Sequence, residues 1–108
     1  MVKKSPREAS MALYEEIVKL KDLDSCYRFF QDLCSINELR SMEQRFDVAK
    51  LLHEGKVYTE IVEETGASSA TISRVRRSML DNGAGGVMQE ILVREGITLP
   101  IEKQEKND

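Results

Sequence analysis

Residues 66–80 combine short polar side chains with three arginines and contain no acidic residue. Hydroxyl and guanidinium groups donate hydrogen bonds to phosphate oxygens and to base edges, which is the chemistry of nucleic-acid recognition. Small side chains early in a helix also let its backbone approach the bases of a major groove. This pattern predicts a DNA contact surface composed of Ser68, Ser69, Ala70, Thr71, Ser73, Arg74, Arg76 and Arg77.

The contact expected of each side chain depends on its position along this helix. Ser69, Ala70 and Ser73 lie early, where such helices meet base edges, whereas Ser68 and Thr71 are expected to donate to phosphate. Exposed amides at the N-terminus of the helix also favour an anion. The three arginines point around the helix, so we expect one or two of them to contact phosphate.

Two short helices, over about 59–65 and 69–80, are predicted to position this surface. Two helices joined through a glycine are typical of a helix-turn-helix, here over about 58–80. Gly66 is expected to adopt a positive φ in the turn, and Ser68 is expected to cap the second helix. The turn and its small apolar core are assigned to Ile61, Val62, Gly66, Ala67, Ile72 and Val75.

Acidic residues oppose DNA binding, both in the first helix of the pair and through the net charge of the whole chain. The first helix of the pair carries Glu60, Glu63 and Glu64, which must face away from the phosphates or lower the affinity. The whole chain also has a net charge of −3, from 16 basic and 19 acidic residues. That acidity lies mainly in residues 81–108, and a small basic face with Arg74, Arg76 and Arg77 lies just before this segment.

The rest of the chain predicts an all-α domain, because apolar residues recur at helical spacing and alternating β-branched runs are missing. Asp22 or Asp24 is expected to cap a helix, Ser35–Glu38 reads as a capping box, and Gly55 suits a helix end. The helices are expected over about 6–20, from the acidic cap to about 34, over about 36–54, and over an amphipathic segment before Gly96.

These elements divide the 108 residues into three parts. Residues 1–5 are expected to form a flexible N-terminus, 6–95 a helical DNA-binding domain and 96–108 a charged C-terminal tail. The first and the long third helix have apolar faces, with Ile17 and Phe46 on them, that are wider than one small core needs. Because a chain of this length builds a thin core, a partner subunit would add to its stability.

The sequence does not indicate an enzyme. Catalysis needs a nucleophile with a base, paired carboxylates in a cleft, or a metal ion. His53 is the single histidine and is expected at the surface near a helix end. Cys26 and Cys34 are expected to be buried, reduced thiols. Two cysteines and one histidine are too few ligands for a closed zinc site. We therefore expect no catalysis, cofactor or metal.

No feature of the sequence indicates a membrane or export. The apolar runs are too short to span a bilayer. The first ten residues, MVKKSPREAS, contain lysines but lack the apolar core of a secretory signal. The chain is therefore expected to be cytoplasmic, without a membrane partner.

The sequence resembles the tryptophan-repressor superfamily, and specifically its YerC/YecD-type branch. The resemblance is carried by LKDLDSCYRFF with DLC in residues 20–34, by INE at 36–38, by QRF at 44–46 and by ETGASSATISRV at 64–75. It implies an intertwined homodimer in which the first, second, third and last helices interlock and two reading heads bind double-stranded DNA.

In the tryptophan repressor, two arginines hold the amino-acid ligand between the long helix and the second reading-head helix. The resemblance places Arg45 and Arg74 at these positions, with Ser35 and Ser78 near the same pocket. Val75 stands where the repressor has a glycine, and its side chain would intrude on the space of an indole. We therefore expect an unknown effector, if one binds, and not tryptophan. An alternative for Arg45 is a surface ion pair with Glu38, Glu43 or Asp47.

Two functions of different classes remain open on the sequence. One is a sequence-specific, dimeric transcriptional regulator, most simply a repressor, that binds DNA through the helix-turn-helix. The other is a helical protein-interaction module that keeps the helix-turn-helix for packing and binds no DNA. The two differ in their response to salt, because DNA affinity falls steeply as phosphate contacts are screened.

Overall fold

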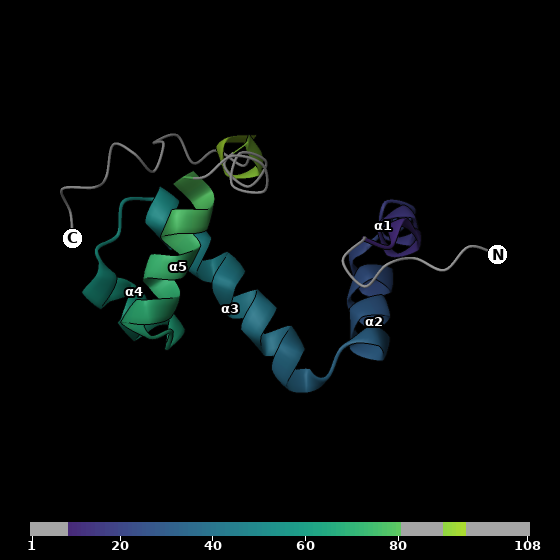
Figure 1. The fold of residues 1–108 in the computed structure, drawn as a ribbon, viewed down its shortest axis with the longest axis horizontal. Helices are drawn as coiled ribbons and strands as arrows, with labels where there is room; N and C mark the ends of the chain where they lie inside the picture. The colour runs from purple at the N-terminus through teal and green to yellow at the C-terminus, as the bar shows by residue number, and fades with distance from the viewer. Residues whose placement is uncertain (1–8, 81–89, 95–108) are drawn as a thin grey trace. The chain divides into compact units, whose positions relative to one another are not determined.

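The computed structural model describes residues 9–80 and 90–94. Every regular element in these residues is an α-helix, so the predicted all-α fold is confirmed (Figure 1). The chain divides into two compact units, Met1–Leu39 (unit 1) and Arg40–Asp108 (unit 2), and each is described by itself. The expected flexible N-terminus at 1–5, the glycine-rich segment at 82–86 and the tail at 96–108 lie outside the described residues.

Unit 1 contains α1 (Met11–Ile17), α2 (Leu23–Leu33) and the first residues of α3 (Ile36–His53). The predicted bounds of the first helix, 6–20, are wrong. Ser10 has extended backbone angles, φ −93° and ψ 114°, so α1 begins at Met11. After Ile17 the amides of Lys19 and Leu20 donate to carbonyls three residues back, which is the tighter turn that commonly closes a helix.

Side chains cap two helices of unit 1 where the sequence predicts caps. Asp22 Oδ1 accepts the amide hydrogen of Ser25 at 2.7 Å, so Asp22 is the cap of α2. At the start of α3, Ser35 donates its amide hydrogen to Glu38 Oε1 at 2.8 Å, and Glu38 donates its own to Ser35 Oγ at 3.1 Å. This reciprocal pair is the predicted capping box.

Unit 1 buries little apolar surface. Neither α1 nor α2 contains a buried residue, and Leu39 is the one buried side chain among the described residues of this unit. Cys26 and Cys34 are free thiols that are only half-buried, so the expectation of fully buried cysteines is wrong. The large apolar side chains that remain exposed are Met11, Tyr14, Val18, Leu23, Tyr27, Leu33 and Ile36.

Unit 2 contains the remainder of α3, α4 (Tyr58–Thr65), α5 (Ser69–Leu80) and a helical segment at 90–94. In this unit α4 and α5 lie against the C-terminal half of α3 (Figure 1). The bounds of α4 and α5 agree with the two predicted helices to within one residue. Their shared core consists of Val48, Ala49, Leu52, Ile61, Ala67, Ile72, Val75, Met79 and Leu92.

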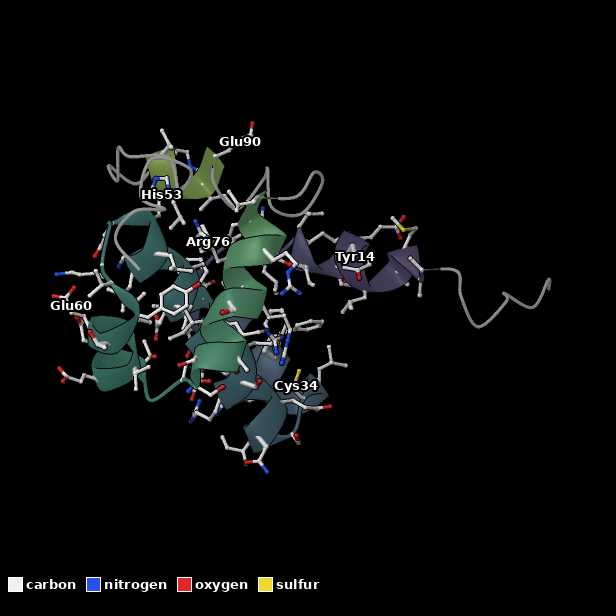
Figure 2. All side chains as sticks on the ribbon, turned by 60° about the vertical axis from the view of Figure 1, so that its left-hand side comes forward. Tyr14, Cys34, His53, Glu60, Arg76 and Glu90 are labelled. Atoms are coloured by element: carbon white, nitrogen blue, oxygen red, sulfur yellow. The ribbon has the colours of Figure 1, made fainter. Side chains whose placement is uncertain are left out.

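The end of α3 differs from expectation at two side chains. His53, labelled in Figure 2, is fully buried, so its predicted place at the surface is wrong. It lies one turn after Ala49, on the face of α3 that packs into the core. Phe46, which the helical spacing assigns to the apolar stripe, is 42% exposed. Gly55 has φ +92° just after α3, the left-handed conformation predicted for this helix end.

Candidate nucleic-acid interface

Gly66 makes the turn between α4 and α5. Its φ of +75° lies in the left-handed region, as the sequence predicts, and its amide donates to the carbonyl of Val62 at 2.8 Å. A Cβ added at Gly66 would meet no heavy atom within 4 Å. The need for glycine is therefore one of backbone conformation and not of space.

Ser68 begins α5. Its Oγ accepts the amide hydrogen of Thr71 at 3.1 Å, which satisfies one of the free amides at the start of the helix and confirms the predicted cap. The hydroxyl of Ser68 also donates to Thr71 Oγ1 at 3.1 Å. The two side chains therefore stabilise the helix start together.

The apolar side of the helix-turn-helix packs against α3. Ile61, Ala67, Ile72 and Val75 are all buried in the core of unit 2. Val62 is 38% exposed, so its assignment to this core is wrong. It lies about 100° around α4 from Ile61, which turns its side chain out of the buried face.

The opposite side of α5 is open to solvent. Ser69, Ala70, Arg74 and Arg77 are exposed, and among the described residues no carboxylate forms an ion pair with Arg74 or Arg77. Of the other four predicted contact residues, Ser68 is exposed, whereas Thr71, Ser73 and Arg76 are half-buried, and Arg76 is already engaged within the chain. The helix therefore presents a polar, basic surface without acidic neighbours in its own sequence.

Among the acidic side chains of α4, Glu60 has a partner at the start of its own helix. The carboxylate of Glu60 accepts the amide hydrogen of Val57 at 3.1 Å, so it serves the start of α4. Figure 2 shows Glu60 on the side of α4 that faces away from α5. Glu63 and Glu64 are exposed.

Sequence reasoning missed Gln44 as a contact to the turn. Its Nε2 donates to the carbonyl of Thr65 at 3.1 Å, in a half-buried position. Thr65 in turn donates its hydroxyl to the Ile61 carbonyl at 2.7 Å and accepts the Ala67 amide at 3.1 Å. Helical spacing predicts an ordinary surface position for a polar residue at 44. No local signal in the sequence indicates that Gln44 contacts the turn.

The residues matched to an effector pocket have separate roles in the structure. Arg45 is exposed and donates from Nη1 to Ser41 Oγ at 3.1 Å, so the expected ion pair with a carboxylate is wrong. A hydroxyl one turn earlier on α3 is within its reach. Arg74 and Ser78 are exposed on α5, and Ser35, which belongs to unit 1, is used in the capping box.

Two further properties of the described residues bear on function. No group of three or more His, Cys, Asp or Glu side chains in residues 9–80 and 90–94 is placed to hold a metal ion. None of the helices that the structure describes is both long and apolar enough to cross a membrane.

The buried core, the glycine turn and the open second helix define the class of this protein: it contains a helix-turn-helix. The family model of the Trp repressor protein matches residues 8–95. The chain therefore belongs to the Trp repressor family, a family of DNA-binding regulators, and the resemblance seen in the sequence is confirmed.

Similar proteins extend this assignment. The chain is 58% identical over 67 residues to the uncharacterized protein YerC of Bacillus subtilis (strain 168), a match that covers 62% of this chain and 64% of that protein. It is similar to the crystal structure of a TrpR like protein from Eubacterium eligens ATCC 27750, with a TM-score of 0.74 and 49% identity over 82% of this chain and 88% of that one. A putative Trp repressor from Staphylococcus aureus gives a TM-score of 0.73 and 44% identity, over 82% and 86% of the two chains.

Proposed function

We propose that this chain is a sequence-specific transcriptional regulator, a repressor, that binds double-stranded DNA as a homodimer. The observation that carries the proposal is the two-sided character of α5. Ile72, Val75 and Met79 bury one side, while the other exposes small polar side chains with Arg74 and Arg77, to which no described carboxylate is paired. A helix of this kind, held by a rigid core and open on its polar face, fits a major groove.

We propose different DNA contacts for different residues of α5. Ser69, Ala70 and Ser73 meet base edges and set the sequence preference, whereas Arg74 and Arg77 contact phosphates. Arg76 contributes less, because it is half-buried and already engaged within the chain. Ser68 and Thr71 act on DNA mainly through the helix start that they stabilise, where free amides favour a phosphate.

The homodimer is supported by the apolar surface of unit 1. A stable helical domain buries one face of each amphipathic helix. Within the single chain α1 and α2 contain no buried residue, and Leu23 is 86% exposed. Helices from a second copy of unit 1 would cover these faces. The domain we propose spans 6–95, and two reading heads would then bind half-sites about 34 Å apart in a near-palindrome.

The first experiment selects bound DNA from a random library and measures affinity for the selected site as a function of salt. A regulator shows a steep fall in log affinity with log salt, because counterions are released from the phosphates. Arg77→Glu should weaken binding to all sequences and reduce this slope. Lys50→Glu, the same charge reversal at an exposed position of α3, is the matched control and should have a smaller effect.

Base contacts are tested by Ser73→Ala on the same library. This change should alter the preferred sequence at one or two positions without changing the salt slope, because it removes a hydroxyl and no charge. If neither Ser73→Ala nor Arg77→Glu changes binding at low salt, the regulator is ruled out. A protein-interaction module that does not bind DNA would then be the better description.

A further inference from the structure

The side chain of Gln44 connects the long helix α3 to the turn of the helix-turn-helix. Its Nε2 lies 3.1 Å from the carbonyl oxygen of Thr65, the last residue of α4. A carbonyl in the last turn of a helix has no amide partner within that helix. Gly66, in its left-handed conformation, then directs the chain away. Gln44 therefore supplies a donor to a group that α4 itself leaves unpaired.

Hydrogen bonds also connect the residues of the turn to one another, so a bond to Thr65 restrains the whole turn. Thr65 Oγ1 donates to the Ile61 carbonyl at 2.7 Å and accepts the amide hydrogen of Ala67 at 3.1 Å. Ala67 is buried, and Ser68, which follows it, caps α5. A shift at Thr65 would therefore move the start of α5, where the proposed base contacts lie.

The role of this hydrogen bond depends on the helix that carries Gln44, which is α3. Helix α3 begins in unit 1, the part proposed to form the dimer, and ends in the core of unit 2. Apolar contacts between α3 and α5 are non-directional and tolerate small rotations of one helix against the other. A hydrogen bond prefers a narrow range of distance and angle, and so it can define that rotation.

We propose that Gln44 is a positioning residue for DNA recognition: it fixes the direction in which α5 leaves the α3 scaffold, and with it the spacing of the two reading heads. The proposal rests on the proposed function. Glutamine suits the role because it offers an uncharged donor with enough reach at a half-buried site. Gln44→Met keeps the length of the side chain and removes the donor.

The experiment compares wild type, Gln44→Met and Gln44→Asn in two measurements. The first is the dissociation constant for operators whose half-sites are separated by different numbers of base pairs. The second is amide hydrogen exchange at Gly66 and Ala67. Gln44→Asn keeps the amide group but shortens the side chain, so it provides a second test if the methionine variant does not fold. Gln31→Met, the same change at an exposed position of α2, is the matched control.

We expect both Gln44 variants to bind the preferred operator about 3- to 10-fold more weakly, the range given by one lost hydrogen bond. They should also accept a wider range of half-site spacings and exchange the Gly66 and Ala67 amides faster. Gln31→Met should match the wild type in every measurement. The affinity is measured at a temperature at which circular dichroism shows each variant fully folded.

A purely structural role for Gln44 would lower the melting temperature and leave both the affinity and the spacing preference at wild-type values. That outcome overturns the inference while the proposed function stands. If the wild type binds no DNA, the proposed function fails and the role of Gln44 in DNA recognition fails with it. The exchange measurement then shows only whether Gln44 holds the turn.

Discussion

The amide of Gly66 donates to the carbonyl of Val62 at 2.8 Å, and this bond closes α4 while Gly66 itself has φ +75°. The bond and the left-handed residue together end α4 and turn the chain toward α5. Because nothing lies within 4 Å of a Cβ built at Gly66, the backbone conformation alone determines which residues fit.

Gly66→Ala should therefore lower the free energy of unfolding by about 1–2 kcal/mol, the strain of a left-handed conformation in a residue with a Cβ. Gly66→Asn should lower it less, because asparagine visits this region more readily. Urea unfolding followed by circular dichroism measures both variants. Equal stability of Gly66→Ala and wild type would contradict the role assigned to the turn.

Acid should weaken the caps of unit 1. Hydrogen bonds from Ser25 hold the pKa of Asp22 below its usual value, and hydrogen bonds from Ser35 do the same for the pKa of Glu38. A carboxyl whose pKa is lower in the folded state stabilises the fold above its unfolded pKa, and this contribution is lost as the pH falls through the folded pKa.

The melting temperature should thus fall as the pH is lowered from about 5 through the range below 4. The double variant Asp22→Asn, Glu38→Gln keeps side chains that can accept the capping hydrogen bonds but do not titrate. Its melting temperature should depend less on pH over the same interval, as scanning calorimetry would measure. An identical pH dependence in wild type and double variant would show that these two caps do not titrate as described.

A charge on the apolar faces should prevent assembly of the chain. Phe46→Glu and Ile17→Glu are each expected to give an unfolded or aggregated protein, because the proposed dimer core would have to bury an unpaired carboxylate. Thr59→Glu places the same charge at an exposed position of α4 and should remain a folded dimer. Analytical ultracentrifugation with circular dichroism distinguishes the states. A soluble, folded monomer from either apolar-face variant would refute the interlocked dimer.

Tryptophan should not bind. Val75 is 9% exposed and belongs to the core of unit 2, so its side chain occupies volume that a glycine would leave empty. Arg45, one of the two arginines matched to the ligand of the repressor, bonds to Ser41. Isothermal titration calorimetry should give no heat beyond that of a buffer injection. Binding in the micromolar range would mean that the Val75 side chain is accommodated.

Local signals explain how much of the fold was predictable. Caps and helix-ending glycines depend on residues at most four positions away in the sequence. The expected hydrogen bond or backbone conformation is present at Asp22, at Ser35 with Glu38, at Gly55 and at Gly66. Gly66 in this way marked the end of α4, and the cap Ser68 marked the start of α5. Helix α1 lacked such a signal at its true start, since Ser10 makes no side-chain cap, and its predicted bounds were wrong.

Burial and tertiary hydrogen bonds were less predictable. Helical spacing places His53 near a helix end but does not reveal that the end of α3 lies in the core. Spacing likewise could not separate Val62 from Ile61, its buried neighbour. Gln44 and Thr65 are 21 residues apart, so their bond exists only once α3 and α4 have packed. The surface of α5 was predictable in part from residue type and spacing. Ser69, Ala70, Arg74 and Arg77 are exposed as expected, whereas Thr71, Ser73 and Arg76 are half-buried.

The exposed apolar side chains of α1 and α2 have a consequence for how much active protein a cell holds. If these helices complete their core with a second chain, as proposed, folding and association form one equilibrium, and thermal stability rises with protein concentration. A newly made chain would remain open to proteases until it met another copy. The regulator would then respond to its own abundance, with a threshold below which little of it survives to act.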